Sequence, residues 1–396
     1  LAMGVPYGPL KRASKSVLGT KVETAPFPSA SPPTDEEAYA YAFEWHDYFA
    51  PRALHRLLKA DVKARVATRP LKTKTPTGEI ELNRGAIIVP LGIQKTSRKE
   101  IRDILKTIAS EDGVSVHAIS SGLTPTGIDL GSPSLKALKK PEPLLIVGSG
   151  ARTYEAGEVW RLLDQIFDMK VTLVEGVKVS GLDLSRYTHI ILVNGAGSRI
   201  SSTGVEKIGR WISGGGVLVA LKNSTQWAVD KKLANATFKK SGTEDKKDNG
   251  KETKGKKEKE EKPERMNYGA HDKTEDAKIL SGAFFQTDLD ITHPMGYGYA
   301  ERERAVFRNS RIYMIPSKNP YGTVAQYTDE PLLSGYIHEE ELEKLKGSAS
   351  IIAQKRGKGA VILMVDNPLF RAYTHGTTKL FLNAIFFGGI LEKTKE

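Results

Sequence analysis

The second half of the sequence repeats a short apolar run followed by a helical pattern. Residues 144–147 are apolar throughout, and the helix expected after them has an apolar residue at each position of one face: Val159, Leu162, Leu163, Ile166 and Phe167. Strands that are apolar throughout are typical of parallel sheets with helices on both faces. Similar runs follow at 171–174, 189–193 and 217–221. The pattern predicts a doubly wound, flavodoxin-like parallel sheet.

A smaller α/β unit is expected before this sheet. Helical patterns at 50–60 and after Ser97, where Ser97 and Glu100 form a capping box, alternate with apolar runs at 39–45, 62–67, 85–91 and 114–119. The alternation predicts a small α/β domain with a largely parallel sheet. We therefore expect this domain over residues 37–138 and the flavodoxin-like domain over 139–396. Residues 1–36 are rich in Pro, Ser and Lys, which indicates a linker or the tail of a missing upstream domain.

A charged segment at about 239–268 is expected to interrupt the second domain. It consists almost entirely of Lys, Glu, Asp, Gly, Ser and Thr, with both signs of charge interspersed. Such a composition offers too little apolar surface to offset the entropy of ordering, so it predicts a disordered insertion. Apolar sequence resumes at Ile279. Runs at 350–353 and 361–365 and a helix at 377–387 are expected to complete the same core.

Several classes of function are excluded by what the sequence lacks. It contains no cysteine, which excludes disulfides, thiolate metal sites and a cysteine nucleophile. No apolar run reaches the length of about 18 residues that a membrane-spanning helix needs. The net charge of +12 is spread along the chain without a basic helix or interleaved aromatic residues, so we expect no nucleic-acid partner. We also expect no cofactor.

A metal site is not expected either. Among the eight histidines only His338 has a glutamate at the spacing of a short zinc-binding pair, which is Glu341. The segment that follows His338 reads as a charged helix facing solvent, and no third ligand is specified elsewhere.

Five polar residues follow expected strands and could line one crevice: Glu155, Asn194, Lys222, Asp366 and Arg371. Carboxyl ends of parallel strands meet at one edge of a sheet, where such folds bind ligands. The alternative is that these side chains serve capping and loop hydrogen bonds.

Two further motifs are weaker candidates for a site. Gly148-Ser149-Gly150 offers backbone amides for an anion, but it lacks the third glycine of a dinucleotide-binding loop. Ser224 lies near a strand-to-helix elbow without the Gly-x-Ser-x-Gly motif, and helix capping is its ordinary role.

Longer strings resemble a known family. They are residues 154–165, 122–134 and 183–189, extended by 215–220, 331–336 and 379–384. The chain from about Tyr39 onward resembles the C-terminal region of bacterial zinc carboxypeptidase-like proteins. This resemblance implies an upstream metallopeptidase domain in the same protein and a periplasmic or secreted location. It also implies a class I glutamine amidotransferase-like fold whose usual cysteine would fall near Lys222.

The function expected from these observations is non-catalytic. No zinc ligand can be carried over to His338 or Glu341, and a cysteine nucleophile is missing. The chain is therefore expected to be an accessory region that supports, or presents substrate to, a peptidase domain absent from it. The alternative is a small-molecule or glycan-binding module that uses the strand-end crevice. A third interpretation is an enzyme with a site that no motif reveals.

Overall fold

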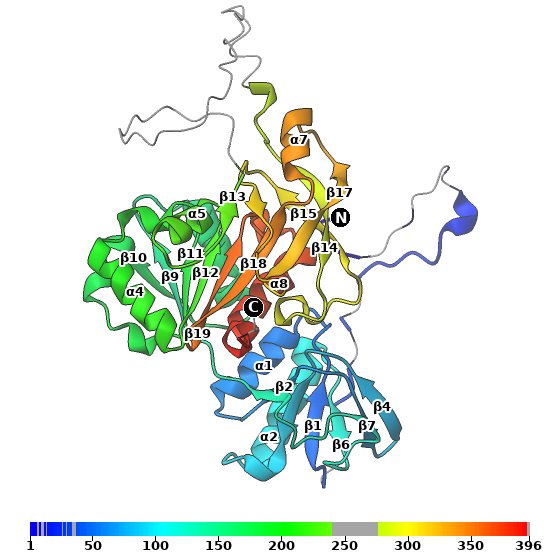
Figure 1. The fold of residues 1–396 in the computed structure, drawn as a ribbon. Helices are drawn as coiled ribbons and strands as arrows, with labels where there is room; N and C mark the ends of the chain where they lie inside the picture. The colour runs from blue at the N-terminus through cyan, green and yellow to red at the C-terminus, as the bar shows by residue number, and fades with distance from the viewer. Residues whose placement is uncertain are drawn as a thin grey trace, which may run out of the picture.

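The computed structural model describes residues 37–239 and 276–393, together with 1–5, 8, 12, 14–25, 27–28 and 30–33. The charged insertion expected at 239–268 lies outside the described residues, apart from Lys239, and so does part of the expected linker at 1–36. Figure 1 shows the described chain as two packed α/β bodies. We call them the N-terminal unit (residues 37–138) and the C-terminal unit (residues 139–239 and 276–393). In the described parts, no helix combines the length and the hydropathy that crossing a membrane requires.

The N-terminal unit is built on a five-stranded sheet in the order β6-β1-β5-β2-β8. Its strands are β1 (Ala40–Phe43), β2 (Arg65–Ala67), β5 (Ile87–Pro90), β6 (His117–Ile119) and β8 (Leu135–Ala137). Two helices pack their apolar side chains on it, α1 (Ala50–Lys59) and α2 (Arg98–Thr107). The capping box expected at Ser97 and Glu100 is present at the start of α2. A small sheet of β4 (Gly78–Leu82), β3 (Leu71–Thr75) and β7 (Thr126–Gly127) completes the unit.

The expectation of a largely parallel sheet in this unit is wrong, because every strand pairing in it is antiparallel. Helix α1 does join two strands that run in the same direction, β1 and β2, but β5 lies between them. Likewise α2 joins β5 to β6, and β1 lies between those two. This is the split βαβ arrangement, in which alternation of strands and helices does not produce parallel neighbours.

The C-terminal unit confirms the doubly wound sheet. Its parallel strands are β9 (Pro143–Val147), β10 (Thr172–Glu175), β11 (His189–Leu192), β12 (Val217–Leu221) and β19 (Gly359–Met364). Their order in space is β10-β9-β11-β12-β19, which is the flavodoxin order 2-1-3-4-5. The α-helices that lie wholly within the described residues of this unit are α3 (Thr153–Trp160), α4 (Ser202–Gly214), α5 (Asn223–Asp230), α7 (Glu339–Leu345) and α8 (His375–Phe387).

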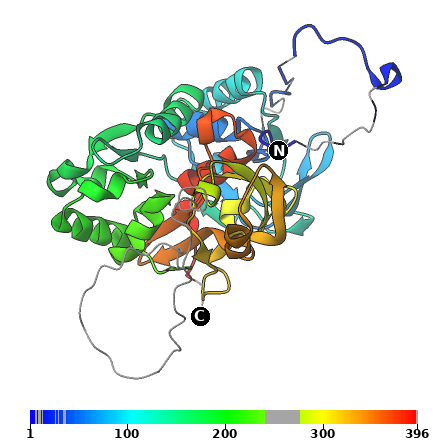
Figure 2. The same ribbon diagram turned by 90° about the horizontal axis from the view of Figure 1, so that it is seen from above.

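The sheet continues past β19 as an antiparallel extension, of which the sequence patterns predicted only the run at 350–353. Its strands follow in the order β18 (Ala349–Arg356), β17 (Thr323–Ser334), β14 (Ala283–Leu289) and β15 (Glu303–Arg308), with the short β13 (Thr237–Phe238) and β16 (Met314–Ile315) beside them. Seen from above in Figure 2, α8, coloured red, lies near the centre of the molecule. Buried and exposed residues alternate along β14, as in strands with one covered face, so no continuous apolar run marks it.

The segments on either side of residues 240–275 form one sheet and one core. Strand β12 from the first segment pairs in parallel with β19 from the second, with Leu218 opposite Val361 and Ala220 opposite Leu363. Both strands are buried along their whole length, and Phe381 of α8 belongs to the same apolar cluster. Neither segment could cover these apolar faces without the other.

The two units are joined through Trp45, which follows β1. Its ring is fully buried against Phe386 and Phe387 of α8, with ring centroids 5.6 and 4.7 Å away. Its indole Nε1 donates to Asn383 Oδ1 at 2.7 Å. Lys379 Nζ donates to the Trp45 carbonyl oxygen at 2.6 Å. Because an apolar core runs through this contact, the units are held in one relative position.

Acid is expected to destabilise the fold through His189, which is buried in β11 with Nδ1 2.8 Å from Thr188 Oγ1. Burial lowers the pKa of His189 from 6.5 to about 4. Between these two values the unfolded chain binds a proton that the folded chain does not, so the free energy of unfolding falls as pH falls through this window. At about 1.4 kcal/mol per pKa unit the loss is about 3 kcal/mol.

Urea denaturation at several pH values between 7 and 4 measures this loss. The His189→Asn variant has no group that titrates at this position and is expected to show a shallower pH dependence than the unmodified chain. Equal slopes for the two proteins would contradict the assignment.

Candidate functional site

Lys222 stands at the strand-to-helix turn between β12 and α5. Its backbone has φ 52° and ψ −125°, a strained conformation for any residue other than glycine. An elbow of this kind at the end of a central strand holds the nucleophile in several α/β enzymes. The Lys222 side chain is buried, and its Nζ donates to Glu155 Oε1 at 3.1 Å and to Asn309 Oδ1 at 2.9 Å.

Glu155 and Asn194 complete this cluster. Glu155, in the first turn of α3, accepts through Oε2 from the backbone N–H of Asn194 at 3.0 Å. Asn194 in turn accepts through Oδ1 from the backbone N–H of Asn223, the first residue of α5, at 3.3 Å. Three of the five residues predicted to meet at the strand ends are thus brought together. Their side chains make hydrogen bonds to one another and to the backbone of the loops. This favours the alternative interpretation, in which they serve loop hydrogen bonding and do not bind a ligand.

Glu158 lies one turn after Glu155 and was not predicted from the sequence. Its carboxylate accepts from Asn367 Nδ2 and from the backbone N–H of Arg371, both at 2.6 Å. Burial raises the pKa of Glu158 above its usual value. Arg371 therefore enters the cluster through its backbone, while its guanidinium lies over the Phe370 ring, 5.3 Å from the centroid. The i, i+3 spacing from Glu155 is the signal that could have revealed Glu158.

Asp366 turns its carboxylate toward a different set of partners. Oδ1 accepts from Arg308 Nη1 at 2.8 Å, and Oδ2 accepts from Tyr327 Oη at 2.5 Å and Ser350 Oγ at 2.6 Å. Arg308 is fully buried, so this is an ion pair inside the antiparallel extension. Asp366 consequently does not serve the crevice for which it was predicted.

The loops that follow β9 and β11 close the strand-end edge between them. Gly150 and Gly195 both have positive φ values, and a Cβ on Gly195 would overlap the Gly150 carbonyl oxygen. The backbone N–H of Arg152 donates to the Asn194 carbonyl oxygen at 3.0 Å. Because the two loops touch through their backbones, the Gly148-Ser149-Gly150 turn has no open space beside Gly195 for an anion.

His338 and Glu341 do not form a metal site. His338 precedes α7 and accepts through Nδ1 from the backbone N–H of Glu340 at 3.3 Å. Contrary to expectation, Glu341 does not face solvent: it is buried and accepts from Tyr313 Oη at 2.6 Å and Lys344 Nζ at 2.8 Å. Among the described residues, no three His, Cys, Asp or Glu side chains are placed to hold a metal ion together.

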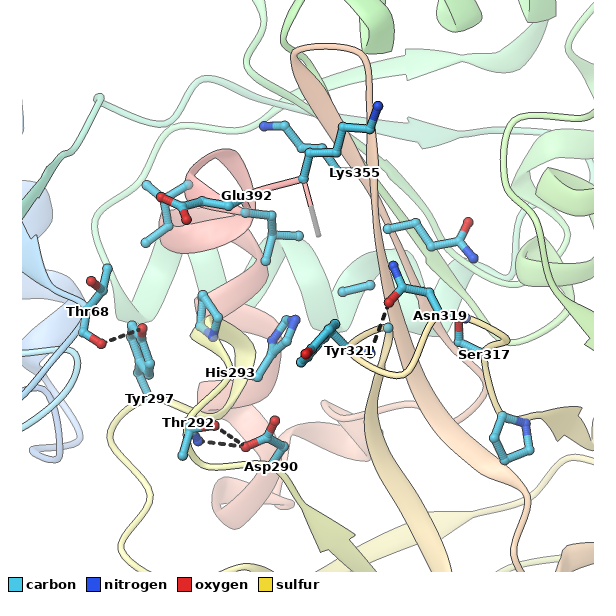
Figure 3. A pocket seen from close by; sticks show the side chains of 18 of the residues that line it. Thr68, Asp290, Thr292, His293, Tyr297, Ser317, Asn319, Tyr321, Lys355 and Glu392 are labelled. Atoms are coloured by element: carbon cyan, nitrogen blue, oxygen red, sulfur yellow. Dashed lines mark hydrogen bonds between the residues drawn. The ribbon is translucent and has the colours of Figure 1, made fainter. Parts of the chain in front are cut away.

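A large cleft opens elsewhere, where the two units meet (Figure 3). Its volume is about 1280 Å³. Thr68 and Ser134 line it from the N-terminal unit, and the opposite walls come from the loops at 290–297 and 315–322 and from the chain at 390–393. Such positions between units are a common place for ligand sites. No sequence pattern predicted this cleft, because its walls come from loops that are far apart along the chain.

The titratable side chains of the loop at 290–297 are either neutral near pH 7 or already accept hydrogen bonds within the loop. Burial lowers the pKa of His293 to about 4, so the imidazole is neutral near pH 7, and its Nδ1 accepts from the Met295 N–H at 3.1 Å. Burial raises the pKa of Tyr297 to about 12. Asp290 accepts from Thr292 Oγ1 at 2.6 Å and from the Thr292 backbone N–H at 2.9 Å. Tyr321 also lines the cleft and is 63% exposed (Figure 3). These groups suit binding better than proton transfer.

Comparison with known proteins gives likeness of structure only. No protein-family model matches the chain, and no curated protein matches its sequence. A GMP synthase subunit protein of Thermoplasma acidophilum is similar over 62% of this chain and 94% of its own, with 11% identity and a TM-score of 0.37. PurLQS of Thermotoga maritima is similar over 61% and 98%, with 10% identity and a TM-score of 0.38. A ThuA-like protein of Bacteroides uniformis is similar over 66% and 93%, with 11% identity and a TM-score of 0.38. The assignment of a mixed α/β fold with a flavodoxin-type strand order rests on the sheet described above.

Proposed function

We propose that this chain is a ligand-binding module whose ligand lies in the cleft between the two units and is not chemically changed there. The observation that carries this proposal is the cleft itself. Its volume of about 1280 Å³ exceeds the range of roughly 300–1,000 Å³ usual for small-molecule sites. Trp45 and α8 hold the two units together beside it, so no closure of the units is needed to form the site.

The composition of the elbow supports a non-catalytic role. The Lys222 ammonium donates to Glu155 and Asn309, and an ammonium held in this way has no lone pair with which to attack a substrate. A serine near the elbow would need a general base to take its proton. Glu155 is the carboxylate at the elbow, and it is already paired with Lys222.

The family resemblance supplies a context for the proposal. Pro133 and Ser134, at the end of the string 122–134, line the cleft. We therefore propose that the chain is an accessory region of a zinc carboxypeptidase-like protein, and that it supports a metallopeptidase domain of the same protein. This role predicts that a peptidase domain supplied separately would bind the chain, and that excess cleft ligand would change the rate of peptide hydrolysis.

A Thr237→Trp variant is expected to abolish ligand binding, because Thr237 is an exposed residue of the cleft wall and an indole there would project into the cleft and clash with a bound ligand. Thermal-shift screening of saccharides and peptides, followed by calorimetry, measures binding, and chromatography of the mixtures measures turnover. The matched control is Thr77→Trp, at an exposed turn of the N-terminal unit.

The expected result is binding without turnover that is lost only in the Thr237 variant. Turnover that disappears in a Lys222→Met variant while the fold is retained would show that the elbow is catalytic and would overturn the proposal.

A further inference from the structure

We propose that the cleft takes an acidic oligosaccharide, a ligand with a chain of hydroxylated rings and at least one carboxylate. This inference rests on the proposed function, because it names the chemistry of the ligand in the same cleft. Three properties of the cleft carry it: the sign of its charge, the side chains that line it and its size.

The cleft has an excess of positive charge. Five basic side chains line it against two carboxylates, Asp290 and Glu392. Both carboxylates already have partners, since Glu392 pairs with Lys136 at 2.6 Å and Asp290 accepts from Thr292. Arg69 and Lys318 make no ion pair or hydrogen bond with any described residue, and they stand on walls from different units. A concave surface lined by one sign of charge concentrates ligands of the opposite sign.

The remaining lining includes side chains that suit the hydroxyl groups of a sugar. Hydroxyl and amide side chains stand on every wall, among them Thr68, Ser134, Ser317, Asn319 and Gln354. These groups both donate and accept, which suits sugar hydroxyls that do the same. Tyr321, an exposed residue of the cleft lining, offers a flat ring (Figure 3). A ring of this kind packs against the apolar face of a sugar while its hydroxyl stays in water.

The size of the cleft indicates more than one sugar ring. Its volume of about 1280 Å³ is larger than a site for one drug-sized molecule, roughly 300–1,000 Å³. An acidic peptide would find the same cations and is the competing ligand in the test below. The hydroxyl and amide groups of the walls, which stand among apolar side chains such as Ile315 and Leu391, match sugar hydroxyls that both donate and accept. The saccharide is therefore the class that the lining favours.

The test compares three probes by calorimetry at low and high salt: tetragalacturonate, a neutral galactose tetramer and tetraglutamate. We expect tetragalacturonate to bind, to weaken with salt, and to lose about tenfold or more in affinity in an Arg69→Glu/Lys318→Glu double variant. The matched control is Lys74→Glu, at an exposed position of β3 outside the cleft. A Tyr321→Ala variant is expected to weaken tetragalacturonate binding at both salt concentrations.

The outcomes separate this inference from the proposed function. If the neutral tetramer binds as tightly as the acidic one, or if only tetraglutamate binds, and Thr237→Trp abolishes that binding, the cleft is a ligand site but the acidic saccharide is the wrong ligand. If tetragalacturonate binds equally to the Thr237→Trp and double variants, the cleft is not its site and the inference is wrong, while the proposed function is still tested by the screen of saccharides and peptides. Failure of tetragalacturonate to bind at millimolar concentration also overturns the inference.

Discussion

Replacing Arg308 with methionine is expected to lower the free energy of unfolding by about 3–5 kcal/mol, the range for breaking one partner out of a buried ion pair. Arg308 is fully buried, and its Nη1 donates to Asp366 Oδ1 at 2.8 Å. Without the guanidinium, the Asp366 carboxylate stays in the apolar interior with only the hydroxyls of Tyr327 and Ser350 to stabilise its charge. The cost is therefore mainly that of an uncompensated buried charge.

Urea denaturation measures this effect, and the chain offers a matched control. Arg302 pairs with Asp288 at 2.7 Å on the surface, where the two side chains are 57% and 49% exposed. Arg302→Met is expected to cost at most about 1 kcal/mol, because exposed pairs contribute little. The double variant Arg308→Met/Asp366→Leu should recover much of the lost stability, since it removes both buried charges. A similar cost for Arg308→Met and Arg302→Met would refute the account.

Replacing Trp45 with alanine is expected to have the largest effect of a single substitution at the contact between the units. Emptying a large aromatic site in a core costs about 3–5 kcal/mol. The Asn383 Oδ1 atom also loses the indole N–H that it accepts at 2.7 Å, and an unsatisfied buried acceptor adds about 1–3 kcal/mol. Asn383 Nδ2 still donates to the carbonyl oxygens of Met295 and Tyr297, so its side chain cannot turn away freely.

Chemical denaturation followed by circular dichroism and by tyrosine fluorescence tests this prediction. Trp160→Ala is the matched control, because that ring is 40% exposed and its loss should cost far less. Trp45→Phe separates the two terms, since it keeps a ring but removes the N–H. If Trp45→Ala unfolds with the same midpoint as Trp160→Ala, the units do not depend on this contact.

The parallel sheet could be predicted because its central strands are buried on both faces and therefore almost entirely apolar. β12 and β19 show this clearly. The antiparallel extension could not be recognised in the same way, because residues of β14 alternate between buried and half-exposed. The antiparallel pairing of the N-terminal unit was missed for a different reason. Local patterns predict that β1 and β2, which α1 connects, run in the same direction. They do not predict that β5, a later strand, lies between them.

The candidate site, too, could be predicted from the sequence only in part. Glu155, Asn194 and Lys222 could be placed together because the ends of parallel strands share one edge. Asp366 also follows a parallel strand, but its carboxylate pairs with Arg308 of the antiparallel extension instead of facing the strand-end crevice. No local sequence pattern predicts this pairing. The cleft depends on loops from both units, whose meeting is decided by the packing of Trp45 on α8. Tertiary contacts of this range leave no periodic signal in the sequence.

The pairing of β12 with β19 has a consequence for synthesis of the chain. β12 ends at Leu221, while its neighbour β19 begins only at Gly359. At the usual ~5–20 residues per second, a ribosome needs roughly seven to thirty seconds to make the intervening stretch. During that time the half-built sheet ends in an edge strand whose five residues are destined for full burial. An apolar edge of this kind is open to pairing with other nascent chains. The interval before β19 emerges is therefore when this protein has most need of a chaperone.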